Sequence, residues 1–337
     1  MSDGPSTHRV TVLGGGSWGS AFARMVALHG AHVTLVCRTR AQADEVARTR
    51  RNPAYLPQLH LPAAVRVASM EDDDPVRAAD VVVAALPSRA VNAVAAWLGR
   101  RLPAGAGVLS LTKGLEPVTG RRLSQAWADA LPPGTPFAVL SGPNHAEEVV
   151  LGQPAAAVVA GDEDLSRRVQ ALLTGPRFRV YLNPDLVGVE FCAAAKNVIA
   201  VAAGMSDGLG FGDNAKAALI TRGLAEMTRL GQAFGAAGAT FRGLAGMGDL
   251  VATCTSRHSR NRMAGELIAH GVPAGEVEGR LGQVVEGLAT VRALLHAAEG
   301  AGVELPISRE VAAAAFAGRP AAACLDALMS RAPAAEE

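Results

Sequence analysis

The stretch Arg9-Val-Thr-Val-Leu-Gly-Gly-Gly-Ser-Trp-Gly19 decides the fold that this sequence adopts. It starts as a short apolar run, turns through consecutive glycines and leads into a helical pattern. The glycines fit G-x-G-x-x-G, in which Gly14 permits a tight turn, Gly16 lets the backbone approach a pyrophosphate, and Gly19 allows close packing of the helix on the sheet. Glycine-rich turns are common, but the strand-like run before this one and the helix after it favour a dinucleotide-binding turn.

Short apolar runs alternate with helical patterns through the first half of the chain. The predicted strands cover residues 9–13, 33–37, 65–68, 81–86, 107–111, 137–140, 155–160 and 179–182. Several of these runs are apolar throughout, as strands covered on both faces must be. Helical patterns such as 17–29 and 40–49 lie between them. The alternation predicts an α/β fold with a Rossmann-type, doubly wound and mostly parallel sheet.

The character of the sequence changes near Pro184, where the strand-like runs stop. Ala- and Leu-rich helical patterns follow over residues 186–204, 214–231, 260–270, 285–300 and 308–317. The stretch Asn183-Pro184-Asp185 is suited to stop the last strand and cap the first of these helices. We therefore predict a dinucleotide-binding Rossmann domain over residues 1–187 and an all-helical substrate-binding and catalytic domain over 188–337.

The bulk composition excludes several functional classes. A chain of 337 residues can form two cores, and a formal net charge of +1 gives no broad electrostatic footprint for nucleic acid or an anionic membrane. No apolar run approaches the roughly 18 residues of a membrane span. Residues 1–7 lack the cationic and apolar regions of a signal peptide. We expect a cytoplasmic protein with no nucleic-acid partner and no membrane insertion.

The cysteine and histidine patterns indicate no metal site. The cysteines form no C-x-x-C pair, and the eight histidines show no ligand spacing with each other or with the cysteines. Buried free thiols in a reducing compartment are therefore expected at Cys37, Cys192, Cys254 and Cys324. We predict no bound metal.

The end of the second predicted strand distinguishes between the two nicotinamide cofactors. An acidic residue there would hold a ribose 2′-hydroxyl, whereas this chain has Cys37-Arg38-Thr39-Arg40. An arginine can accept a 2′-phosphate, so the sequence favours NADP(H). The alternative is that Arg38 and Arg40 are solvated residues at the start of a helix.

Polar residues also follow three other predicted strands, at Leu86-Pro87-Ser88, Thr112-Lys113-Gly114 and Ser141–Ala146. In open α/β sheets the carboxyl ends of the strands line the ligand crevice. Lys113 is therefore expected to meet cofactor or substrate. The alternative is an exposed loop lysine without a function.

Lys196 lies in the otherwise apolar stretch Glu190–Gly204, which predicts a buried helix. Burying an unpaired ammonium costs several kcal/mol, so this lysine is either paired for structure, with Glu190 or Asp207, or held for chemistry. Burial and a nearby cation would lower its pKa toward neutrality and suit acid–base work. Asp249, which follows a glycine-rich stretch, could orient Lys196 or contact a substrate.

Hydroxyls and arginines gather in Thr253-Cys-Thr-Ser-Arg-His-Ser-Arg-Asn261, ahead of a predicted helix. Hydroxyls, a guanidinium and helix N-terminal amides together form a phosphate site. The substrate would then be a small phosphate ester. The alternative is a Ser/Thr-capped loop with incidental arginines.

Several blocks of the sequence, in order from about residue 9 to 331, resemble one known family. They are Gly14–Gly19, Ser141–Glu148, Ala194–Val198, Ser206–Glu226, Gly248–Leu250, Thr253–Ser256, Ser259–Asn261 and Val284–Gly287. Together they resemble NAD(P)-dependent glycerol-3-phosphate dehydrogenase of the bacterial type. The resemblance implies a helical second domain similar to that of 6-phosphogluconate dehydrogenase. It also implies NAD(P)H-dependent reduction of dihydroxyacetone phosphate to sn-glycerol 3-phosphate, which supplies glycerophospholipid synthesis.

By position, the resemblance implies that Lys196 is the proton donor and acceptor on the C2 oxygen. The implied substrate contacts are Lys113, Gly142, Asn144, Lys196, Asp249, Ser259, Arg260 and Asn261. The implied cofactor contacts, added to Gly14, Gly16 and Gly19 of the turn, are Ser17, Trp18, Arg38, Tyr55, Lys113, Ala146, Arg260, Val284 and Glu286.

Two positions depart from the family pattern. Asn144 stands where serine is usual, and Thr39 stands where many members have a second basic residue. The second departure keeps both NADP(H) and NAD(H) open as cofactors. Two alternatives to the implied activity remain: another small phospho- or hydroxy-acid dehydrogenase of the same architecture, and a catalytically silent nucleotide-binding protein. The apolar helical segments are compatible with a homodimer.

Overall fold

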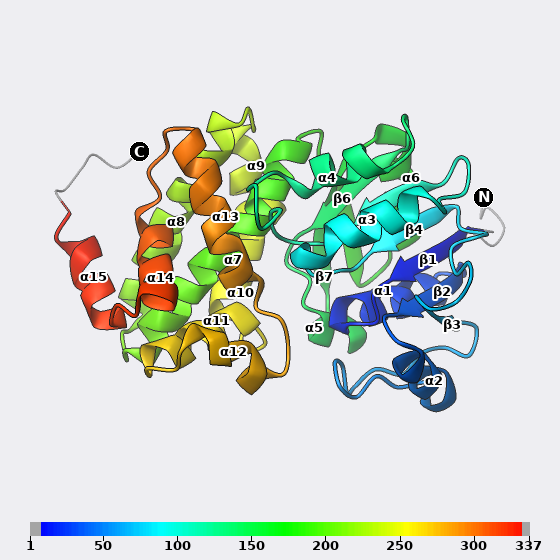
Figure 1. The fold of residues 1–337 in the computed structure, drawn as a ribbon, viewed down its shortest axis with the longest axis horizontal. Helices are drawn as coiled ribbons and strands as arrows, with labels where there is room; N and C mark the ends of the chain where they lie inside the picture. The colour runs from blue at the N-terminus through cyan, green and yellow to red at the C-terminus, as the bar shows by residue number, and fades with distance from the viewer. Residues whose placement is uncertain (1–7, 332–337) are drawn as a thin grey trace. The chain divides into compact units, whose positions relative to one another are not determined.

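The computed structural model describes residues 8–331. Residues 1–7, where no signal peptide is predicted, lie outside this range. The chain divides into two compact units (Figure 1). The first comprises the chain up to Leu86, with Ala90–Thr112 and Ser124–Leu186, and the second comprises Pro87–Arg89, Lys113–Leu123 and the chain from Val187 onward.

The first unit is built on an eight-stranded sheet in the order β3-β2-β1-β4-β5-β6-β7-β8. Neighbouring strands from β3 to β6 are parallel, β7 is antiparallel to β6, and β8 is parallel to β7. The predicted doubly wound, mostly parallel sheet is therefore confirmed. The strands are β1 (Arg9–Leu13), β2 (His32–Cys37), β3 (Arg66–Ser69), β4 (Val81–Ala84), β5 (Gly107–Ser110), β6 (Phe137–Ser141), β7 (Ala155–Gly161) and β8 (Phe178–Leu182).

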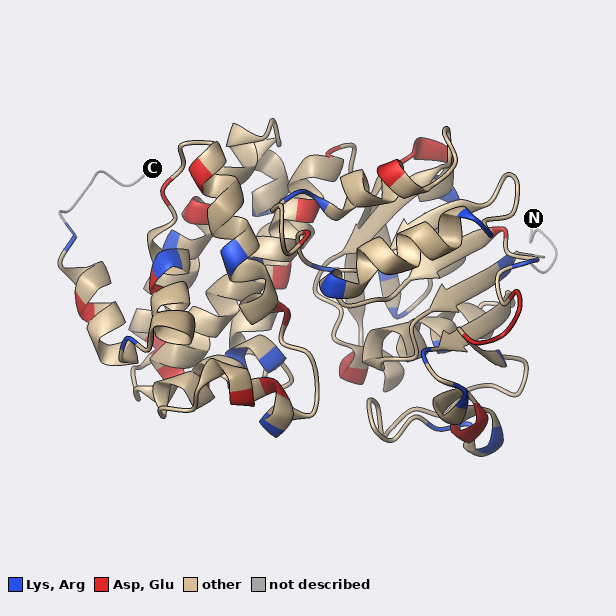
Figure 2. Ribbon diagram, in the orientation of Figure 1, with Lys and Arg blue, Asp and Glu red and all other residues tan. Residues whose placement is uncertain are grey.

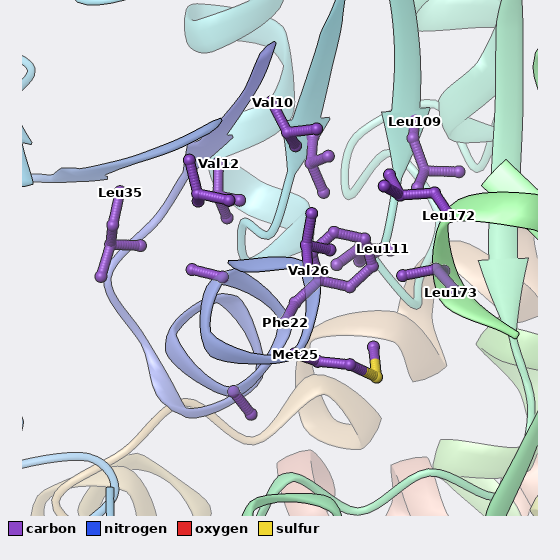
Figure 3. Packing of buried hydrophobic residues seen from close by; sticks show 14 of the residues in the cluster. Val10, Val12, Phe22, Met25, Val26, Leu35, Leu109, Leu111, Leu172 and Leu173 are labelled. Atoms are coloured by element: carbon purple, nitrogen blue, oxygen red, sulfur yellow. The ribbon is translucent and has the colours of Figure 1, made fainter. Parts of the chain in front are cut away.

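Helices cover the sheet and bury its strands on both faces. They are α1 (Ser17–Leu28), α2 (Arg40–Thr49), α3 (Val91–Gly99), α4 (Leu123–Ala130), α5 (Ala146–Val150) and α6 (Glu163–Leu173), and the 3₁₀ turn η1 (Ser88–Ala90) precedes α3. In Figure 3, Phe22 and Val26 project from α1 into a cluster with Val12 of β1 and Leu172 of α6. All four residues of β4 are buried, as a central strand of such a sheet requires.

The second unit is helical, as the sequence predicts. It contains α7 (Leu186–Gly208), α8 (Asp213–Ala233), α9 (Gly238–Arg242), the π-helical turn η2 (Leu244–Gly248), α10 (Asp249–Thr255), α11 (Arg260–Ala269), α12 (Ala274–Leu281), α13 (Glu286–Gly300), α14 (Pro306–Ala317) and α15 (Ala321–Met329). A Cβ on Gly265 would lie 2.0 Å from the Val201 carbonyl oxygen, so α11 crosses α7 at backbone contact.

Helix α7 forms the core of the second unit. Every residue from Gly188 to Met205 is buried. By length and composition α7 is the one helix among residues 8–331 that could cross a membrane, but 89% of its most apolar window is buried inside the protein. A buried helix of this kind is the core helix of a folded domain, in which tertiary packing takes the place of lipid.

The segment Lys113–Leu123 packs with the helical unit although it follows a strand of the sheet. Arg122 donates to Glu190 of α7 at 2.7 Å, and both side chains are largely buried. Gly120 has φ +69°, and a Cβ there would lie 2.6 Å from the Ala293 carbonyl oxygen of α13. These contacts fix the loop that carries Lys113 against α7 and α13.

Charged residues of both signs are interspersed in each unit (Figure 2). This pattern agrees with the net charge of +1. The predicted free and buried state of all four cysteines is confirmed.

Candidate active site

The glycine turn after β1 has the form that a bound pyrophosphate requires. Gly14 has φ +115°, and a Cβ there would lie 2.2 Å from the Ala85 carbonyl oxygen. A Cβ on Gly19 would lie 2.0 Å from the Gly14 carbonyl oxygen. Around Gly16, by contrast, no atom lies within 4 Å of a Cβ. Packing therefore explains two of the glycines, whereas the bare backbone at Gly16 faces open space that a ligand can enter.

Hydrogen bonds from neighbouring segments hold the turn in place. The Gly15 carbonyl oxygen accepts from Gln42 at 2.7 Å and from the buried Asn52 amide at 2.8 Å. The Ser17 hydroxyl donates to the Tyr55 carbonyl oxygen at 2.7 Å. The structure thus joins two of the predicted cofactor residues, Ser17 and Tyr55. Asn52 is a supporting residue that the sequence analysis missed, because nothing local indicates its contact.

The amide groups that begin α1 are available to an anion. Gly16 is the N-cap residue and makes no side-chain cap. The N–H groups of Ser17, Trp18 and Gly19 have no partner within the helix by its geometry, and they carry the positive end of its dipole. The turn and this helix start therefore fit the pyrophosphate of a dinucleotide.

The other predicted residues of the first unit lie at the carboxyl ends of its strands or on the helices that follow. Trp18 packs edge-on to Phe22 at 6.2 Å between ring centroids, and Arg38 is exposed just after β2. Beyond β6, Gly142 has φ +141°, and a Cβ there would lie 2.9 Å from the Ala156 carbonyl oxygen. The remaining two, Asn144 and Ala146, are buried near the start of α5.

In the second unit, Lys196 is buried and held by two oxygen atoms. Its Nζ lies 2.5 Å from Oδ1 of Asp249 and 2.8 Å from Oγ1 of Thr253. Burial lowers the pKa of Lys196 to about 8, assisted by the nearby Lys113 ammonium and opposed by the Asp249 carboxylate. A lysine in this state exchanges its proton near neutral pH.

Asp249 is shared between two lysines. Its Oδ2 accepts from Lys113 Nζ at 2.9 Å, while its Oδ1 faces Lys196. Burial alone would raise the pKa of Asp249, but the two ammonium groups outweigh burial and lower this pKa well below its usual range. The structure therefore brings together three predicted residues, Lys113, Lys196 and Asp249, around one buried carboxylate.

Within residues 8–331, Lys196 forms no ion pair with Glu190 or Asp207, the two structural partners that the sequence suggested. Glu190 pairs with Arg122. Asp207 pairs with Lys216 and Arg262, each at 2.7 Å. The alternative that Lys196 forms a structural ion pair with Glu190 or Asp207 is therefore wrong, and the carboxylate beside Lys196 is that of Asp249.

A relay of buried amides links the lysine cluster to α11 and α13. The Asn197 side chain donates to the Lys113 carbonyl oxygen at 3.3 Å and accepts from Asn261 Nδ2 at 2.9 Å. Oδ1 of Asn261 in turn accepts from the Gly287 amide at 2.8 Å. The predicted substrate residue Asn261 thus also serves to position its neighbours. The positioning role of Asn197 was missed, although this residue directly follows Lys196 in the sequence.

The start of α11 carries the remaining predicted substrate residues. Ser259 caps the helix through the Arg262 amide at 3.2 Å. Arg260 is exposed, and its Nη1 lies 3.3 Å from the Val284 carbonyl oxygen. Two predicted cofactor residues, Arg260 and Val284, are therefore neighbours.

Glu286 lies at the first turn of α13. Its carboxylate accepts from the Ser88 amide at 3.1 Å and from the Ser88 hydroxyl at 2.7 Å. Burial raises the pKa of Glu286, although these hydrogen bonds oppose the rise. Ser88 belongs to the polar stretch predicted after the fourth strand, but its contact with Glu286 was not predicted.

The contact between Thr253 and Lys196 was also missed. Thr253 stands four residues after Asp249, and this spacing places both side chains on one face of α10. The spacing was a usable signal for the contact. Within residues 8–331 no group of three or more His, Cys, Asp or Glu side chains is arranged to hold a metal ion.

Comparison with known proteins agrees with both units. The sequence profile described as NAD-dependent glycerol-3-phosphate dehydrogenase N-terminus matches residues 9–166, and the corresponding C-terminus profile matches residues 185–326. A glycerol-3-phosphate dehydrogenase [NAD(P)+] of Thermus thermophilus is 48% identical over 326 residues, covering 96% of this chain and 99% of the relative. One of Lysinibacillus sphaericus is 46% identical over 331 residues, covering 96% of each chain.

A solved structure agrees as closely. The crystal structure of glycerol-3-phosphate dehydrogenase from Coxiella burnetii has a TM-score of 0.93 and 36% identity, covering 96% of this chain and 99% of its own. Sequence profiles, relatives and fold thus agree over nearly the full length of the chain. The chain belongs to the NAD(P)-dependent glycerol-3-phosphate dehydrogenase family.

Proposed function

We propose that this protein catalyses the reversible NAD(P)H-dependent reduction of dihydroxyacetone phosphate to sn-glycerol 3-phosphate, with Lys196 as the proton donor. The observation that carries the proposal is the buried Lys196 ammonium, held between Asp249 and Thr253 with a lowered pKa. The relatives are named for this dehydrogenase activity and for both nicotinamide cofactors. We extend the activity and both cofactors, NADP(H) and NAD(H), to this chain.

The hydrogen bonds of Lys196 leave one proton for the substrate. An ammonium has three N–H donors, and two of them are directed to Asp249 and Thr253. The Thr253 hydroxyl donates its own hydrogen to the Asp249 backbone carbonyl at 2.6 Å, so it accepts from Lys196. The third N–H is available to the C2 oxygen of the substrate.

The ammonium has two tasks in the reductive direction. When bound, the nicotinamide cofactor supplies a hydride to the ketone carbon. Lys196 stabilises the negative charge that develops on the C2 oxygen and then donates its proton to it. In the oxidative direction the neutral amine of Lys196 accepts that proton. Asp249 keeps the amine oriented in both protonation states because it carries its charge throughout the neutral pH range.

The start of α11 supports phosphate binding. The exposed Arg260 guanidinium and the first amides of α11 offer charge and N–H donors to a phosphate. Asn261 connects this anchor to Asn197, the residue next to Lys196, through a 2.9 Å hydrogen bond. Anchoring the phosphate positions the C2 carbonyl, and such positioning accounts for several kcal/mol of the barrier.

The first test is Lys196→Met, which removes the amine and keeps a side chain of similar length. We expect the variant to lose the oxidation of NADPH that depends on dihydroxyacetone phosphate. Its affinity for NADPH, measured by the fluorescence of the reduced nicotinamide, should be nearly unchanged. A kcat close to that of the wild type would rule out Lys196 as the proton donor. A panel of hydroxy-acid and sugar-acid substrates tests the alternative dehydrogenases.

The cellular setting follows from the same proposal. We infer that the enzyme acts in the cytoplasm and supplies glycerol 3-phosphate for glycerophospholipid synthesis. A homodimer, and the assignment of residues 1–187 to the cofactor and 188–337 to the substrate and catalysis, stay predictions. Size-exclusion chromatography with light scattering tests the first, and separate expression of the two segments tests the second.

A further inference from the structure

Two arginines and an acidic turn follow the ends of the neighbouring strands β2 and β3. The strands are neighbours, and Cys37 at the end of β2 is in register with Ser69 at the end of β3. Arg38 and Arg40 follow β2, and the acidic turn Glu71–Asp74 follows β3. This is the sheet edge at which the proposed cofactor site would hold the adenosine ribose.

Arg40 is already occupied by this acidic turn. Its guanidinium donates to Oδ1 of Asp72. Its backbone N–H donates to the Glu71 carboxylate at 3.0 Å. The neighbouring Thr39 hydroxyl accepts a hydrogen bond from the Gln42 backbone N–H at 3.3 Å. Oxygen atoms of the protein therefore cap the start of α2. The Asp72 carboxylate balances the positive charge of Arg40.

Asp72 is itself held in the orientation that engages Arg40. Its Oδ2 accepts from the Ser69 backbone amide at 3.0 Å. This hydrogen bond, together with the Arg40 guanidinium, lowers the pKa of Asp72. Asp72 is therefore charged throughout the neutral range.

Arg38 is in the opposite situation. Its side chain is exposed, and among residues 8–331 it has no ion pair or hydrogen bond. The two arginines that could serve a 2′-phosphate are therefore unequal, since one is free and the other is neutralised. A 2′-phosphate that recruits Arg40 must displace Asp72 and approach two carboxylates, and this unfavourable arrangement is a specificity element.

We propose that Asp72 sets the preference between NADP(H) and NAD(H) by holding Arg40 away from the 2′-phosphate, so that Arg38 alone meets it. The inference rests on the proposed cofactor site at this sheet edge. It assigns a specificity role to a residue of the turn after β3, which does not itself touch the cofactor. It predicts a weaker discrimination between the two cofactors than two free arginines would give.

A double-mutant cycle on Asp72 and Arg40 tests the proposal. The measured quantity is the Kd of NADPH and of NADH, from nicotinamide fluorescence at fixed ionic strength and without substrate. Asp72→Asn keeps an oxygen for the Ser69 amide and removes the charge that holds Arg40. We expect it to tighten NADPH roughly threefold to tenfold, the scale of an exposed charge-assisted contact, with NADH nearly unchanged. Arg40→Ala alone should change neither Kd appreciably, and in the Asp72→Asn background it should abolish the gain.

The matched control is Asp73→Asn, which removes the same charge from an exposed neighbour in the same turn. An unchanged ratio of NADPH to NADH affinity in Asp72→Asn would overturn the proposal. So would a gain that persists after Arg40→Ala, or an equal gain in Asp73→Asn. Wild-type protein that binds neither cofactor would instead refute the proposed function on which the inference rests, so the two failures are distinguishable.

Discussion

Replacing Asp249 by asparagine isolates the charge that balances Lys196. The asparagine has nearly the same shape and keeps an oxygen for a hydrogen bond. It removes the carboxylate that lies 2.5 Å from Lys196 and 2.9 Å from Lys113. Both ammonium groups then lack this counter-charge, and burial acts on the pKa of Lys196 with less opposition.

The size of the effect follows from the pKa of Lys196. An opposite charge a few ångströms away moves a pKa by roughly one to three pH units, so its loss lowers the pKa of Lys196 from about 8 to about 6. At pH 7 the ammonium fraction then falls from about nine-tenths to about one-tenth. Protonation alone therefore reduces the rate of dihydroxyacetone phosphate reduction about tenfold at pH 7. The lost orientation of the amine reduces it further.

The assay is the pH profile of reductive kcat/KM between pH 5.5 and 9. We expect the descending limb of the Asp249→Asn variant to lie at lower pH than in the wild type, so that its deficit shrinks on acidification. The matched control is Asp207→Asn. Asp207 lies on α7 and, like Asp249, lies between two cations, here Lys216 and Arg262, but it does not contact Lys196. This control variant should be less stable than the wild type, but the descending limb of its pH profile should stay at the wild-type pH.

Two results would refute this reasoning. One is a deficit in Asp249→Asn that is the same at every pH, with the limb in its wild-type place, because the carboxylate would then not control the protonation of Lys196. The other is an Asp207→Asn variant whose limb moves as far as that of Asp249→Asn, because the effect would then be a general consequence of lost charge.

Three further predictions follow from the same geometry. Since Lys196 must be protonated to donate, the wild-type kcat/KM of the reductive reaction should fall as pH rises through about 8. The kcat/KM of the oxidative reaction, which needs the neutral amine, should rise over the same range. Parallel pH profiles of the two reactions would contradict this assignment. Gly16→Ala should leave the melting temperature unchanged, because a Cβ there meets no atom within 4 Å, yet weaken NADPH roughly tenfold; unchanged affinity would mean that no pyrophosphate lies against Gly16. Arg260→Ala should raise the KM for dihydroxyacetone phosphate roughly tenfold to a hundredfold and spare a phosphate-free ketone, and an equal loss for both would remove Arg260 as the anchor.

The sheet was readable from the sequence because its strands are buried on both faces. Such strands appear as continuous apolar runs, and the predicted run at 81–86 contains β4, whose residues are all buried. The sequence did not predict that β7 runs antiparallel to β6. An apolar run indicates burial but carries no information about direction, which depends on how the connecting segments return to the sheet.

The partner of Lys196 shows where local reasoning ends. Glu190 is six residues earlier on the same helix, and at about 100° per residue it lies on a different face. Asp207 is eleven residues later and close to the same face, but about 16 Å along the helix axis and beyond reach. Asp249 reaches the lysine from α10. Only the docking of α10 on α7 decides that contact.

The sequence by itself determined the two fold types, the glycine turn, the burial of Lys196 and the family. These properties follow from local periodicity, from residue size and from the order of motifs along the chain. The tertiary structure alone decided which carboxylate neutralises Lys196, how Asn197 and Asn261 connect the lysine cluster to α11, and that Arg40 is occupied while Arg38 is free. The physical reason is that charges and hydrogen-bond donors choose partners by distance in space. Elements far apart in the chain set that distance when they pack.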